Sequence, residues 1–243
     1  MLLSRQNVSS VLTLVARMLH PSGSHAPAPS PTPASLTSSL FLSLVTTVDH
    51  LVRHRKDHIT PLFPSLVATL SPILSALRLS GFGTTGSSSD ESPSANVGKR
   101  AEREARATFP AWVWDGGPTS IGRTEARAVG RLLAGLSAKT ASTSLKRKHG
   151  EGKEVGVSSL AAPLSKHAPF ILLPYLRACV SAVAPIPAPV RGELMGGWFE
   201  VMDAMGKWEK EALMKGFLGE DEEAERGVLR GMWRTWEKER YRG

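Results

Sequence analysis

LSKHAPFILLPYLRACV, residues 164–180, opens a block with few chain breakers that continues to Tyr241. This apolar stretch is expected to form a helix that begins at Pro169, since proline suits a first helical turn, and ends near Val183. Pro174 lies within it, removes one backbone donor and is expected to kink it. Four of the six tryptophans and both tyrosines fall in this block. Because aromatic side chains bury large areas, the block is predicted to hold the best-packed core.

Three further helices are predicted in the same block. The second follows the proline-rich residues 184–189 and carries an apolar stripe at steps of three and four, interrupted by Gly196 and Gly197. A helical glycine costs about 1 kcal/mol relative to alanine, so the pair suggests that another backbone packs closely there. A third helix is expected over residues 208–218. The fourth begins in the acidic run 220–223, which complements the positive end of the helix dipole.

The closing helix is predicted to have two different faces. At about 100° per residue its apolar side chains gather on one side, while basic side chains wind along the other. The predicted core of the block consists of Tyr175, Trp198, Met202, Trp233 and Trp236. The basic residues on the other side are candidates for contact with RNA or a protein partner: Arg226, Arg230, Arg234 and Lys238.

Three segments of the block resemble the C-terminal domain of the unhealthy ribosome biogenesis protein 2 family, also called nucleolar preribosomal-associated protein 2. They are residues 164–176, PVRGELMGGWFEVMD (residues 189–203) and RGVLRGMWRTWEK (residues 226–238). The resemblance covers residues 160–242 well and rests on helix order and spacing, because none of the segments is a short catalytic signature. It departs from the family pattern at Pro174, where an acidic or polar residue is expected.

This resemblance implies a function and a set of partners. The family acts as a non-enzymatic assembly factor for early large (60S) ribosomal subunit precursors in the nucleolus, where it supports rRNA-precursor processing as a helical scaffold. The implied partners are the pre-ribosomal particle, other early large-subunit factors including a DEAD-box RNA helicase, and rRNA. Because family members are much longer helical proteins, the resemblance also implies that this chain corresponds to the C-terminal part of one.

Composition limits the classes of function. The 243 residues are enough to bury a real core in one or two domains. A formal net charge of +8 favours polyanionic surroundings such as RNA or anionic lipid. The single cysteine, Cys179, excludes an internal disulfide, and its apolar helix indicates a buried structural thiol rather than a nucleophile. No apolar run approaches the roughly 20 residues that span a bilayer, so no membrane partner is expected.

The predicted fold is all-α, with α-solenoid-like helical hairpins and a compact C-terminal helical bundle separated by flexible Pro/Ser/Gly-rich linkers. Helices over residues 36–59 and 61–79, joined at Pro61, make the hairpin, and a helix over residues 124–139 is expected to pack onto the C-terminal block. Seven stretches follow from this pattern: an N-terminal amphipathic helix (1–20), a linker (21–35), the hairpin (36–80), a flexible linker (81–98), a helical segment (99–140), a basic flexible loop (141–159) and the C-terminal domain (160–243).

Three upstream features have more than one interpretation. No acidic residue precedes Asp49, so the N-terminal stretch fits either a mitochondrial transit peptide or a helix of a larger helical array. Residues 110–114, which include two tryptophans, are either a docking strand or a plug on the helical core. The basic cluster Lys146, Arg147 and Lys148 is a localisation signal, an RNA contact or a solvated loop.

We predict no catalytic residue, metal site or cofactor. Residues 81–86 match G-x-G-x-x-G, but a helix is expected before them and a Ser-rich stretch follows, whereas a dinucleotide site needs a preceding strand and a following helix. His50, His54 and His58 share one helix flank, but no nearby cysteine or facing carboxylate motif completes a zinc site, and Asp49 and Asp57 are expected to pair with Arg53 and neighbouring bases. Two other functions remain open: a membrane-surface or trafficking helical scaffold, and a mitochondrial helical protein.

Overall fold

Helices account for all of the regular secondary structure in the part of the chain that the computed structural model describes, residues 4–20, 34–84, 109–110, 112, 121–138, 160–181, 184–217 and 222–240. The all-α prediction is therefore confirmed. In chain order the elements are α1 (Arg5–Met18), α2 (Ala34–His54), α3 (Lys56–Ile59), η1 (Thr60–Leu62), α4 (Phe63–Ala76), η2 (Leu77–Thr84), α6 (Arg123–Ser137), α7 (Ala161–Val180), α8 (Ala188–Ala204), α9 (Lys207–Ala212), η3 (Leu213–Phe217, a π-helical segment) and α10 (Glu223–Arg240).

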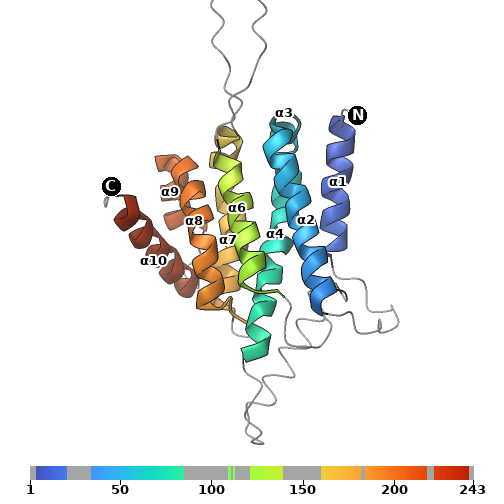
Figure 1. Ribbon diagram of the computed structural model, residues 1–243. Coiled ribbons are helices and arrows are strands. Elements are labelled where there is room, and N and C mark those ends of the chain that lie inside the picture. Colours follow the sequence, from blue (N-terminus) through green and yellow to red (C-terminus); the bar gives the residue numbers. More distant parts are fainter. Residues whose placement is uncertain are drawn as a thin grey trace, which may run out of the picture.

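The helices lie in two layers. In one layer α2, α6 and α8 follow one another, and in the other α1, α4, α7 and α10 do so; Figure 1 shows α2, α6 and α8 in front of α4 and α7. A single cluster of buried apolar side chains runs from Val8 in α1 to Met232 in α10. The C-terminal helices therefore share their core with the helices upstream, and the expected packing of the helix at 124–139 onto them is confirmed, because α6 and α8 form the most extensive helix pair.

Several helix boundaries differ from those expected. The helix expected over residues 36–59 is divided at Arg55, whose backbone (φ −133°, ψ 38°) separates α2 from α3. The helix expected to begin at Pro169 already begins at Ala161, because buried side chains at Leu160 and Leu164 continue its apolar stripe upstream. Packing against α4 thus offsets the cost of a proline inside a helix.

The two helices of the expected hairpin pack mainly on other helices and not on each other. α2 packs chiefly on α6, and α4 packs on α1 and α7. The stretch Lys56–Ser80, which contains α4, could span a bilayer by its length and composition, because an 18-residue window within it has a mean hydropathy of 1.5. No such run was expected from the sequence. Half of that window is buried, and Leu66, Leu70 and Ile73 of α4 are completely so, as in a core helix.

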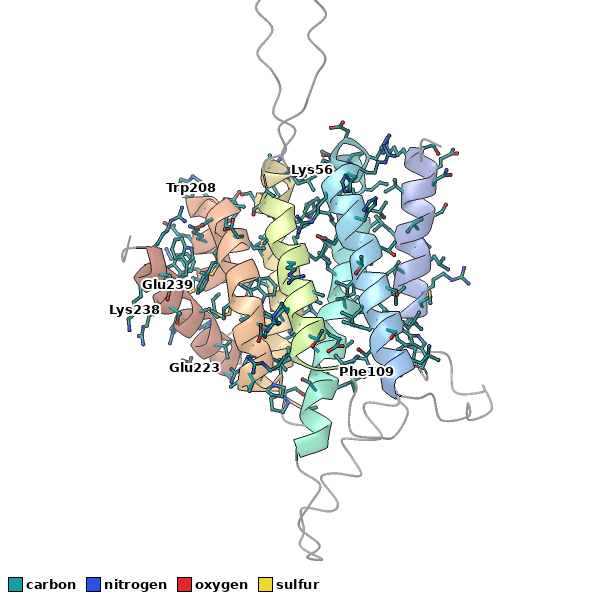
Figure 2. All side chains as sticks on the ribbon, viewed as in Figure 1. Lys56, Phe109, Trp208, Glu223, Lys238 and Glu239 are labelled. Carbon is teal, nitrogen blue, oxygen red and sulfur yellow. The ribbon has the colours of Figure 1, made fainter. Side chains whose placement is uncertain are left out.

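Two buried charged residues fix α6 against α2 and α3, and periodicity gave no sign of either. Lys56, labelled in Figure 2, donates from Nζ to the carbonyl of Ala138 at the end of α6, where the helix dipole favours a cation. Burial lowers the pKa of the Lys56 amine. At the other end of α6, Glu125 accepts from the backbone N–H of Gly122 at 2.7 Å and from the hydroxyl of Ser38 on α2.

Trp112 acts as a plug on the core rather than as part of a strand. Its indole N–H donates to the carbonyl of Met18 at 2.7 Å, and its own carbonyl accepts from the hydroxyl of Thr37 at 3.0 Å. Several predicted features lie wholly or mostly outside the described residues: the linkers at 21–35 and 81–98, the first part (99–108) of the helical segment at 99–140, Trp114, and the loop at 141–159 with its basic cluster at 146–148.

Candidate functional site

The C-terminal helices are positioned by a close backbone contact between α6 and α8. A Cβ added to Gly197 would lie 2.9 Å from Cβ of Leu133 and would also collide with the carbonyl of Gly130. A Cβ added to Gly130 would lie 2.7 Å from the carbonyl oxygen of Glu193. The close approach expected at the glycine pair is therefore present at Gly197, whereas a Cβ at Gly196 would meet nothing within 4 Å.

An ion-pair network closes the outer side of the same contact. The Glu193 carboxylate on α8 accepts from Arg123 at 2.7 Å and from Arg127 at 3.0 Å, both on α6. Hydrogen bonds from Arg127 and Arg123 lower the pKa of the Glu193 carboxyl, and the bond to Glu193 raises the pKa of Arg127. The three side chains hold α6 and α8 at a fixed register.

Trp198, which follows Gly197 in α8, belongs to a buried aromatic pair. The rings of Tyr175 on α7 and Trp198 on α8 are 4.7 Å apart between centroids, and both are almost wholly buried, as is Met202. Burial raises the pKa of the Tyr175 hydroxyl, and it raises the pKa of the Cys179 thiol to about 11. Cys179 therefore stays protonated near neutral pH, which gives it the chemistry of a structural thiol.

α10 is attached to the rest of the molecule by a small apolar contact and a polar one. Leu229 and Met232 are its only buried residues. The polar contact, called here the α10 clasp, consists of Asp203, Lys210, Trp236 and Arg240. In it the Trp236 indole N–H donates to Asp203 at 2.8 Å, Arg240 pairs with the same carboxylate, and the Lys210 ammonium lies 4.4 Å from the Trp236 ring centroid.

The two tryptophans of α10 differ from the core positions expected for them. Trp233 and Trp236 are half-buried and meet edge to face, with ring centroids 5.4 Å apart. The Trp233 indole N–H donates to Glu237 on its own helix at 2.8 Å. These two side chains join α10 to the clasp instead of filling the interior between helices.

The four basic residues expected on the outer face of α10 do not all lie on it. Arg226 is half-buried with a buried Nε, so it lies at the boundary with the packed face. Arg230, Arg234 and Lys238 are exposed, and they are called here the basic row. Figure 2 labels Lys238 and Glu239 at the outer edge of α10 and Glu223 toward its other end. Arg230 forms a long ion pair with Glu223, 3.3 Å between Nη1 and Oε1.

The described residues contain no group of three or more histidine, cysteine or acidic side chains that could hold a metal ion. The rings of His50 and His54 instead lie against each other, with centroids 4.2 Å apart. The candidate site is therefore a surface, the outer side of α10 with the clasp that orients it.

A family model described as the Urb2/Npa2 family matches residues 1–243, which is the whole chain. The chain belongs to the Urb2/Npa2 family. No curated protein and no solved structure matches it. The resemblance drawn from residues 160–242 is thus confirmed, and the family match extends over the upstream helices.

Membership of the Urb2/Npa2 family implies a role in ribosome biogenesis and association with pre-ribosomal particles, consistent with a nuclear or nucleolar location. The family is not known as enzymatic. In this Urb2/Npa2 chain, Lys210 and Arg240 are partners of Trp236 that were not expected from the sequence. The sequence shows only that basic residues occur near aromatic ones. Lys210 lies on α9 and Trp236 on α10, so their pairing follows only from the packing of these two helices.

Proposed function

We propose that the chain is a non-enzymatic helical scaffold for early large (60S) ribosomal subunit precursors in the nucleolus, where it supports rRNA-precursor processing. The observation that carries this proposal is the family match over all 243 residues. Two layers of helices with one continuous core also suit a scaffold, since they offer long exposed helix faces to several partners at once.

The proposed partners are the pre-ribosomal particle, rRNA and other early large-subunit factors, including a DEAD-box RNA helicase. The surfaces proposed to meet the particle are the basic row on α10 and the cluster Lys146, Arg147 and Lys148. A mitochondrial function is less well supported, because Val8 and Leu12 of α1 are completely buried and removal of this helix as a transit peptide would uncover the core.

The experiment is to sediment a tagged copy of the full chain on a sucrose gradient and to follow rRNA precursors after its depletion. We expect co-sedimentation with large-subunit precursors and accumulation of unprocessed large-subunit rRNA, with small-subunit precursors unchanged. Sedimentation only as free protein, or a defect confined to the small subunit, would contradict the proposal.

A further inference from the structure

The outer face of α10 is held in a fixed orientation. On the inner side Leu229 is completely buried and Met232 nearly so, and the α10 clasp binds Trp236 and Arg240 to the carboxylate of Asp203. Rotation of the helix about its axis would break both contacts. The outer face of α10, opposite this inner side, is therefore presented to solvent in one orientation.

The basic row runs along that surface at every fourth residue. Four residues of α-helix advance about 6 Å, so the three cations form a line about 12 Å long. Among the described residues no ion pair to Arg234 or Lys238 is present, and the Arg230 pair with Glu223 is solvent-exposed and hence weak. Glu237, on the same side, is engaged with the Trp233 indole. Glu237 keeps its negative charge, so in the C-terminal half of the helix Arg234, Lys238 and Arg240 exceed Glu237 and Glu239 by one positive charge.

Two glycines beside the row have no packing role in the described part of the molecule. A Cβ added to Gly227 or to Gly231 would meet nothing within 4 Å, and both residues are exposed. This differs from Gly130 and Gly197, whose missing side chains admit a neighbouring helix. Glycine inside a helix lowers stability relative to alanine, yet here the folded chain gains no contact from it. Next to the basic row, the helix backbone is therefore exposed to solvent without side chains covering it.

We propose that the outer face of α10 is an RNA-contact surface: the basic row binds successive backbone phosphates, and Gly227 and Gly231 let the sugar–phosphate backbone come close to the helix. This inference rests on the proposed function and names the partner of its α10 surface. Phosphate recognition needs cations and close approach without a fixed base sequence, which is what this face offers.

The composition of the face favours RNA over a protein partner. Interfaces between proteins have an apolar or aromatic centre, whereas interfaces with nucleic acid are polar and positively charged. No exposed residue of α10 is a large apolar one. The exposed large apolar side chains of the described chain lie on other helices: Leu14, Leu36, Phe170 and Trp208.

The first test measures binding of the full chain to a labelled single-stranded RNA oligonucleotide at several salt concentrations. We expect the variant R230Q/R234Q/K238Q to bind at least about tenfold more weakly, with a salt dependence shallower by about two in log–log slope, because up to three phosphate contacts are lost. The matched control is R5Q/R17Q/R131Q, which removes the same charge from exposed positions on α1 and α6 and should bind nearly as the unmodified chain does. Equal loss in both variants would overturn the inference.

The second test measures the contribution of the exposed glycine backbone to RNA binding while the charge of the basic row is kept. The variant G227A/G231A should melt a few degrees higher, because alanine is the better helix former, and yet bind RNA more weakly. Weaker binding by a more stable protein cannot be attributed to unfolding. Unchanged affinity would place the RNA away from these glycines and would overturn the inference.

Failure of this inference is distinguishable from failure of the proposed function. If R230Q/R234Q/K238Q binds RNA as the unmodified chain does but no longer sediments with large-subunit precursors, the row faces an acidic protein and the RNA assignment is wrong. If the unmodified chain binds no RNA yet still sediments with precursors, the inference again fails and the proposed function stands.

Discussion

Glycines at neighbouring positions of α8 have opposite structural roles. Gly197 lies against Gly130 and Leu133 of α6, and Gly196 faces open space. The same residue type in the same helix thus has a packing function at one position and none at the next. Helix propensity alone treats the two positions alike.

We therefore expect opposite effects from the same substitution. Gly197→Ala should lower the free energy of unfolding by about 1–3 kcal/mol, because α6 and α8 must move apart to admit the methyl group. Gly196→Ala should raise it by roughly 0.5–1 kcal/mol through helix propensity. Urea denaturation of both variants measures the two effects. A stabilised Gly197→Ala protein would show that the close α6–α8 contact is absent.

A second prediction at this scale concerns Glu193 and acid. Hydrogen bonds from the arginines keep the pKa of its carboxyl in the folded chain below the ordinary 4.5, so folding is favoured above that value. The stabilisation should be lost as the pH falls below 4.5 through the folded-state pKa, where the unfolded chain binds the proton first. Urea midpoints measured between neutral pH and about pH 3 should therefore fall less steeply for Glu193→Gln than for the unmodified chain. Parallel curves would contradict the role of this ion pair.

At the scale of elements, α10 is attached less extensively than α6, α7 or α8. It contributes two buried side chains, Leu229 and Met232, and Val228 packs partly against the core, while the α10 clasp supplies its polar contact. Such a helix is expected to open locally more readily than α6 or α8, which pack along their length. Its basic row can present a fixed surface only while the clasp is closed.

Removing the clasp carboxylate should loosen α10 without unfolding the molecule. Asp203→Ala removes the acceptor for both Trp236 and Arg240 and should cost about 1–3 kcal/mol, with faster amide hydrogen exchange confined to α10. Asp203→Asn keeps an acceptor for the indole and should have a smaller effect. As a comparison, Arg177→Gln breaks an exposed ion pair with Glu222 and should cost no more than about 1 kcal/mol. Exchange that accelerates equally in all helices would count against a local role of the clasp.

At the scale of the whole molecule, the C-terminal helices depend on the helices before them. The core is continuous from α1 to α10, and α7 and α8 bury much of their apolar surface against α4 and α6. α7 also packs on α8, α9 and α10, but the contacts with α4 and α6 are the larger ones for α7 and α8 respectively.

A fragment comprising residues 160–243 should therefore fold poorly alone. About eighty residues make a marginal core, and this fragment would expose the surfaces that α4 and α6 cover. We expect a shallow thermal transition and weak near-UV circular dichroism, against one cooperative transition for the full chain. A fragment that melts as sharply and at as high a temperature as the full chain would show an independent domain.

Most helices were predictable from sequence because helix periodicity is a local property. Steps of three and four placed α1, α6, α8 and α10 to within a few residues. The errors fell where tertiary packing overrode a local rule. Pro169 reads as a helix start, but the buried stripe of α7 carries the helix through it. The two tryptophans of α10 were expected in the core, but they are half-buried because α10 lies at the edge of its layer.

The sequence by itself determined an all-α fold, the family, and which helix carries exposed basic residues, since each depends on the order and spacing of side chains along the chain. Only the tertiary structure decided that Gly197 rather than Gly196 admits α6, and that Arg226 leaves the basic row. It also decided that Asp203 and Lys210 hold Trp236. The physical reason is that these outcomes depend on which helix faces meet, and contacts between residues far apart in the chain leave no period in the sequence.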